Sequence, residues 1–91
     1  MLLAQPTPVA VWLDATDRPA RLVYRGTRFT TIDEPTPLPH DVDWPTGITH
    51  PPARSGAVGW RFTARSTVTG ETLVFDLLRA ATGWHVVQVY T

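Results

Sequence analysis

Residues 58–65 alternate between apolar side chains and polar or small ones, and no other feature of the chain constrains its fold as strongly. A period of two places successive side chains on opposite faces of a β-strand, whereas the apolar positions of a helix recur every three to four residues. The composition agrees, because Val, Ile, Thr, Phe, Trp and Tyr supply 35 residues while Lys, Glu, Gln and Met supply five. The first group packs well on a sheet, and the second contains favoured helix formers. The sequence therefore predicts an all-β protein.

Similar patterns predict six strands, at residues 8–14, 20–25, 28–33, 58–65, 72–78 and 84–90. Their apolar faces, and hence the predicted core, carry Leu22, Tyr24, Trp60, Phe62, Leu73, Phe75 and Leu77. The pair Gly26-Thr27 indicates a hairpin turn between the second and third strands. We expect residues 1–91 to form a single antiparallel β domain, as a strongly twisted sheet or a half-open barrel, because a flat sheet would leave one apolar face wet.

The alternation stops between residues 34 and 57, where six of the nine prolines lie. Proline fixes its own backbone angle and biases the preceding residue towards extended conformations, which excludes a continuous helix here. We expect a long Pro-rich loop at 34–57, between the third and fourth strands. Residues 1–7 are expected to be a flexible N-terminus.

Length, charge and cysteine content exclude several classes of protein. The longest apolar run, 9–13, is too short to span a bilayer, and the first six residues lack the basic and apolar regions of a signal peptide. The chain has no cysteine, which excludes disulfides, thiol catalysis and cysteine-bound zinc. With a net charge of zero, the chain lacks the basic excess that is typical of nucleic-acid binders. We expect a cytoplasmic protein without a cofactor.

Four candidate metal ligands, His40, Asp41, Asp43 and His50, lie within the Pro-rich loop. Imidazole and carboxylate groups suit zinc or a non-haem metal, but ligands need a rigid scaffold, so a solvated polar loop is the favoured interpretation. Neither serine lies in a nucleophile-elbow pattern, and no glycine-rich phosphate loop is present. We expect no catalytic residues and no enzyme.

Arg21, Arg25, Arg61 and Arg65 alternate with predicted core residues on two strands and are therefore expected on an outer face. Arginines beside aromatic side chains are typical of small β domains that bind single-stranded nucleic acid. Guanidinium groups equally suit the carboxylates of a protein partner. In the alternative arrangement the face is solvated, and its arginines form ion pairs with Asp76, Glu71 or Asp14.

The chain has four tryptophans, which is a large share for its length. Trp60 belongs to the predicted core, whereas Trp12 and Trp84 are expected on the opposite face, Trp84 together with Val86 and Tyr90. An exposed aromatic face would mark a protein-binding surface. A curled sheet would instead bury both faces at its ends. Both alternatives stay open at the level of sequence.

The order of short motifs resembles a domain-of-unknown-function family of small actinobacterial proteins. The motifs are Arg18-Pro19, Tyr24 to Phe29, the loop residue Trp44, Trp60-Arg61-Phe62, Val74-Phe75-Asp76, Gly83-Trp84 and Val89-Tyr90. A similar domain lies at the C-terminus of ImuB-type proteins, relatives of Y-family DNA polymerases that organise translesion synthesis. The resemblance implies a non-enzymatic, protein-binding module linked to DNA repair, and it brings no catalytic residues. This chain departs from the family in its middle loop, where prolines and histidines replace several tryptophans, and at Thr91, which replaces an acidic residue.

Overall fold

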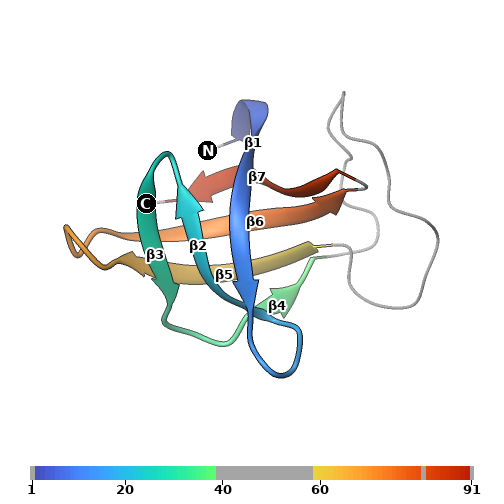
Figure 1. The fold of residues 1–91 in the computed structure, drawn as a ribbon. Coiled ribbons are helices and arrows are strands. Elements are labelled where there is room, and N and C mark those ends of the chain that lie inside the picture. The colour runs from blue at the N-terminus through green and yellow to red at the C-terminus, as the bar shows by residue number, and fades with distance from the viewer. Residues whose placement is uncertain (1, 39–58, 81, 91) are drawn as a thin grey trace.

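Seven antiparallel strands form the fold in the computed structural model, which describes residues 2–38, 59–80 and 82–90 (Figure 1). They are β1 (Leu2–Leu13), β2 (Pro19–Tyr24), β3 (Thr27–Thr31), β4 (Thr36–Pro37), β5 (Gly59–Ser66), β6 (Thr72–Ala80) and β7 (Gly83–Tyr90). The all-β prediction is confirmed. No helix long and apolar enough to cross a membrane occurs in these described ranges.

Six of the strands close into a barrel in the order β3-β2-β1-β7-β6-β5, because β3 also pairs with β5. Apart from the β1–β7 pair, each neighbour in the barrel is also the next barrel strand along the chain, so the topology is an up-and-down meander. The extra strand β4 pairs with β5 at Trp60 and Arg61, beyond the three residues of β5 that pair with β3. The two neighbours β3 and β4 therefore share one edge of β5.

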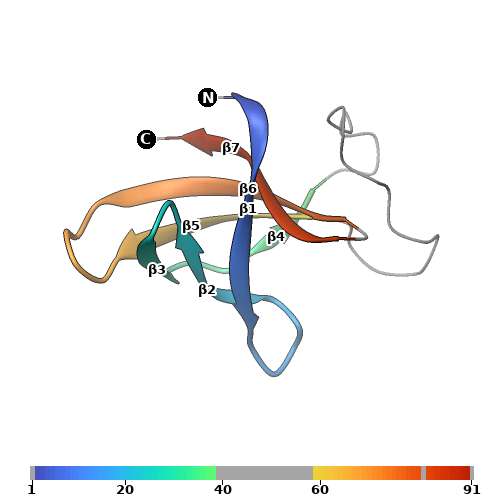
Figure 2. The same ribbon diagram turned by 45° about the horizontal axis from the view of Figure 1, so that its top comes forward.

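The barrel is flattened into two three-stranded layers whose strands cross at a steep angle (Figures 1 and 2). β1, β2 and β3 form one layer, and β5, β6 and β7 form the other. β1 joins the layers, since its N-terminal part pairs with β7 and its residues from Ala10 onward pair with β2. Such crossed packing buries the facing sides of the two layers against each other.

Aromatic rings from both layers meet in the core. Phe75 makes edge-to-face contacts with Tyr24 and Phe29, at centroid distances of 5.3 Å and 5.2 Å, and the Phe62 ring lies 5.9 Å from it at a tilt. Such edge-to-face pairs add to the stabilisation that comes from burying the ring area. The buried set contains Leu22, Tyr24, Phe62, Leu73, Phe75 and Leu77 as predicted, while Trp60 is partly buried against it.

A β-bulge in β7 changes which side chains face the core. Phe75 pairs with Val89, but Leu77 pairs with Val86, so Val87 is the extra residue of β7. Val86 and Val89 both join the main core, whereas Val87 packs on the outer face of the sheet with Leu38 and Leu78. β6 is consequently buried on both faces in this region.

Three details of the sequence prediction need correction. β1 begins at Leu2 instead of residue 8, because β7 supplies a pairing edge that local sequence does not show. The hairpin turn is Arg25-Gly26 instead of Gly26-Thr27, and Tyr24 pairs with Thr27. β4 lies within the expected loop 34–57; the rest of that loop from residue 39 onward falls outside the described residues.

Candidate binding groove on the outer face

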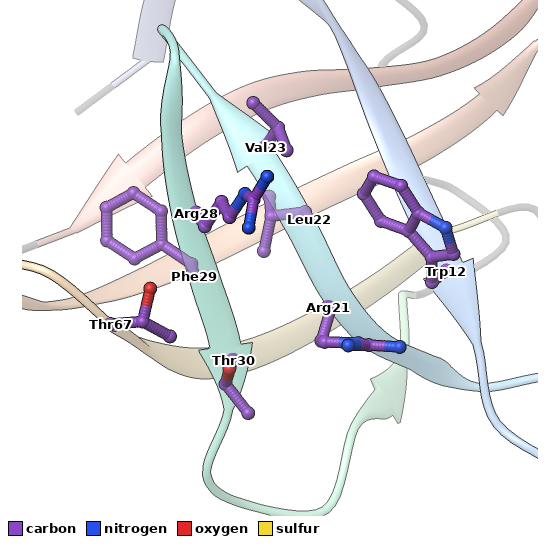
Figure 3. A pocket seen from close by; sticks show the side chains of 8 residues that line it. All are labelled: Trp12, Arg21, Leu22, Val23, Arg28, Phe29, Thr30 and Thr67. Carbon is purple, nitrogen blue, oxygen red and sulfur yellow. The ribbon is translucent and has the colours of Figure 1, made fainter.

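A groove with a volume of about 420 Å³ lies over β1, β2 and β3 on the outside of the barrel (Figure 3). Its lining comprises Trp12, Arg21, Leu22, Val23, Arg28, Phe29, Thr30 and Thr67. Leu22 and Phe29 belong to the core, with exposed fractions of 1% and 3%. The other side chains are those available to a ligand.

The pairing of β2 with β3 explains why these side chains face outward. Leu22 pairs with Phe29 and both side chains point into the barrel, so the residues on either side of them point out. Outward-facing partners continue across the sheet, because Arg21 pairs with Trp12 on one side and with Thr30 on the other. Thr30 in turn pairs with Arg65 of β5, which places Arg65 in the same row.

Arg21 and Arg28 lie diagonally opposite each other on this face, because Arg21 pairs with Thr30 and Arg28 pairs with Val23. The side chains of such diagonal neighbours start roughly 7–8 Å apart. Neither guanidinium forms an ion pair with a carboxylate in residues 2–38, 59–80 or 82–90. Two cations that start from neighbouring positions on one face, without carboxylate partners, favour a bound anion.

Trp12 forms the β1 side of the groove and has an exposed fraction of 49%. The prediction that it lies outside the core is therefore confirmed. A half-exposed indole beside two unpaired guanidinium groups offers a planar apolar surface together with charged donors. This combination suits a ligand that carries both an apolar side chain and an anionic group.

Arg61 also faces outward, from β5 in the other layer, but its guanidinium already pairs with a carboxylate. Its Nε donates to Asp76 Oδ1 at 2.7 Å, its Nη2 donates to Asp76 Oδ2 at 2.9 Å, and its guanidinium lies over the Tyr90 ring. These hydrogen bonds raise the pKa of Arg61, and burial raises the pKa of Tyr90, with the Asp76 charge adding to it. The alternative prediction that an outer-face arginine pairs with Asp76 is confirmed here.

Arg25 and Trp84 do not join the groove. Arg25 lies in the β2–β3 turn, where its guanidinium carbon is 5.3 Å from the Tyr24 ring centroid. Trp84 packs against the main core, on the same face of β7 as Val86. Tyr90 points to the opposite face, because the β7 bulge lies between Val86 and Tyr90. The expected grouping of Trp84 with Trp12 on an outer face is therefore wrong.

Arg28 is a charged groove residue that is absent from the candidate site residues derived from the sequence. It is the second residue of β3 and precedes the buried Phe29, so the alternation that places Arg21 on the outer face places Arg28 there as well. The candidate ligands His40, Asp41, Asp43 and His50 lie outside the described residues. Among the residues that are described, no three His, Cys, Asp or Glu side chains come together in a possible metal site.

Comparisons with protein-family models, with curated proteins and with solved structures find no match to this chain. The resemblance to the actinobacterial family and to the ImuB-type domain stays a prediction.

Proposed function

We propose that this protein is a non-enzymatic interaction module that binds a protein partner through the groove on β1, β2 and β3. The observation that carries the proposal is the diagonal pair Arg21 and Arg28, unpaired within the described residues, beside the half-exposed Trp12. Arginine binds carboxylates in a two-pronged geometry, and exposed tryptophan and arginine side chains commonly dominate the energetics of protein interfaces. The link to DNA repair or translesion synthesis is what the sequence resemblance implies, and the cytoplasmic location is the expectation from the sequence; both are part of the proposal.

Affinity capture from a native lysate tests this function. The bait proteins are the wild type, Trp12→Ala, Arg28→Gln and the matched charge control Arg79→Gln, whose guanidinium lies over Trp84 away from the groove. We expect a set of proteins enriched by the wild type and by Arg79→Gln, and lost with the two groove variants. Recovery of the same proteins by all four baits would remove the groove as the binding surface.

Single-stranded nucleic acid is the second candidate ligand, since guanidinium groups bind phosphates and an indole stacks on bases. The favouring observation is the same proximity of Arg21 and Arg28 to Trp12. Fluorescence anisotropy with a labelled oligothymidine would then show affinity that falls with salt, with a log–log slope of about −1.4 for two neutralised phosphates. Absence of binding at low salt would eliminate this candidate.

A further inference from the structure

We infer that the groove binds an extended acidic segment in which two carboxylates alternate along the chain and an apolar side chain follows on the same face. The inference rests on the proposed function and names the chemistry of the partner. It comes from the order of three groove side chains across neighbouring strands: Arg28 on β3, Arg21 on β2 and Trp12 on β1 (Figure 3).

Spacing supports an extended ligand. The diagonal pair Arg21 and Arg28 starts roughly 7–8 Å apart. In an extended peptide, side chains at positions i and i+2 face the same way and lie about 6.6–6.8 Å apart. Two acidic residues at i and i+2 therefore match the two guanidinium groups, whereas two adjacent acids would point to opposite faces.

Trp12 fixes the third position of the ligand. It is the direct pairing partner of Arg21 on β1, so Arg21 lies between Arg28 and Trp12 in the order of the three strands. The next same-facing side chain of the ligand, at position i+4, reaches the indole, which favours an aromatic or large aliphatic residue there. The recognised pattern is acidic-x-acidic-x-apolar.

The composition of the groove favours this peptide over a nucleic-acid strand. A groove for single strands stacks successive bases on several aromatic side chains. The second aromatic residue of this lining, Phe29, has an exposed fraction of 3% and offers no stacking surface. Val23 pairs with Arg28 and lies two residues from Arg21 on β2, so it gives the groove an apolar surface beside the charged groups, which suits the side chains of a peptide.

The test uses two fluorescein-labelled peptides of identical composition, one containing Glu-Ser-Glu-Ser-Phe and the other Glu-Glu-Ser-Ser-Phe, and a labelled oligothymidine. Anisotropy titrations use the full chain as wild type, Arg21→Gln, Arg28→Gln, Trp12→Ala and the control Arg79→Gln. Circular dichroism melts verify that each variant is folded. We expect the alternating peptide to bind about tenfold more tightly than its isomer, because only it places both carboxylates on one face.

Each groove substitution should weaken the alternating peptide by about fivefold or more, while Arg79→Gln leaves its affinity unchanged. Equal affinity for the two isomers would overturn the inference, since attraction would then depend on charge alone. Tighter binding of oligothymidine than of either peptide would also overturn it. If lysate capture still depends on Trp12 and Arg28 while the isomers bind equally, the proposed function stands and only this inference fails.

Discussion

Arg61 and Asp76 are direct pairing partners on β5 and β6, and the guanidinium holds both carboxylate oxygens, with N–O distances of 2.7 Å and 2.9 Å. The Asp76 side chain is 4% exposed and that of Arg61 is 50% exposed. The Tyr90 hydroxyl lies 3.2 Å from Asp76 Oδ2 and 2.6 Å from Gln88 Oε1. The nearly buried Asp76 carboxylate, on the outside of the barrel, thus has its charge balanced by one half-exposed cation, Arg61.

Removing that cation should destabilise the protein more than losing an ordinary surface ion pair. We expect Arg61→Met to lower the free energy of unfolding by about 2–4 kcal/mol, because it leaves the Asp76 charge buried without its main donor. The double variant Arg61→Met with Asp76→Leu should recover most of this loss. Urea unfolding gives both values, and a loss no larger than that of Arg79→Met would contradict the prediction.

Gly59 allows close packing where β5 begins. A Cβ at this position would collide with the carbonyl oxygen of Leu77 and would lie 2.8 Å from side-chain carbons of Leu38 and Leu78. We expect Gly59→Ala to lower the free energy of unfolding by about 1–3 kcal/mol, as overpacking does. Strand preference alone predicts the opposite sign, since alanine is ordinarily favoured over glycine within a strand. Thermal and urea unfolding of the variant therefore separate the two effects.

Arg25 occupies a left-handed conformation in the β2–β3 turn, with φ of 51°, and is followed by Gly26 with φ of 77°. Two successive positive φ values are typical of the hairpin turn that prefers Asn-Gly. Arg25→Asn should raise the free energy of unfolding by about 0.5 kcal/mol, after allowing for the lost contact with Tyr24. Arg25→Ala loses that contact without relieving the backbone, so a melting temperature of Arg25→Asn no higher than that of Arg25→Ala would contradict the prediction.

Asp14 stabilises the β1–β2 turn through its Oδ1, which accepts hydrogen bonds from the Thr16 hydroxyl at 2.7 Å and from the backbone N–H groups of Thr16 and Arg18. The Thr16 hydroxyl bond and these backbone bonds lower the pKa of Asp14 below its ordinary value of 3.8. A lowered folded-state pKa contributes stability above the unfolded-state value and loses it as the pH falls through the folded-state value.

The stability difference between the wild type and Asp14→Asn should therefore shrink as the pH falls from about 6 to about 2, because asparagine keeps the acceptor without the charge. Urea unfolding at several pH values measures the difference. Glu71→Gln, in an exposed turn, serves as the control for a general loss of negative charge. If the difference in unfolding free energy between the wild type and Asp14→Asn does not change with pH, the folded turn does not stabilise the charged form of Asp14.

Local alternation was sufficient to predict six of the seven described strands and most of the core. The pattern around Phe62 and around Phe75 reports directly which side of each strand is apolar, and both side chains are almost fully buried. The β7 bulge was not predictable in this way. Both Val86 and Val87 are apolar, so the sequence does not show that one faces the main core and the other the outer cluster.

The candidate site was predicted in part, since Trp12 and Arg21 were both selected and both line the groove. What the sequence did not decide is which arginines are already paired, because the partner lies on another strand. Arg61 has its carboxylate opposite it on β6, whereas the strand neighbours of Arg28 supply none. The pairing register of the whole sheet therefore determines that Arg61 has a carboxylate partner and that Arg28 is available to a ligand.

A barrel of six strands is narrower than those that enclose a ligand, and here the rings of Tyr24, Phe29, Phe62 and Phe75 meet inside it. Along β2 and β3, the inward-facing residues consequently form the core, and the outward-facing residues that alternate with them form the groove. Residues 21, 23, 28 and 30 can be varied while Leu22 and Phe29 keep the hairpin packed. The β2–β3 hairpin is thus a surface on which evolution, or a combinatorial library, can change ligand specificity without redesigning the core.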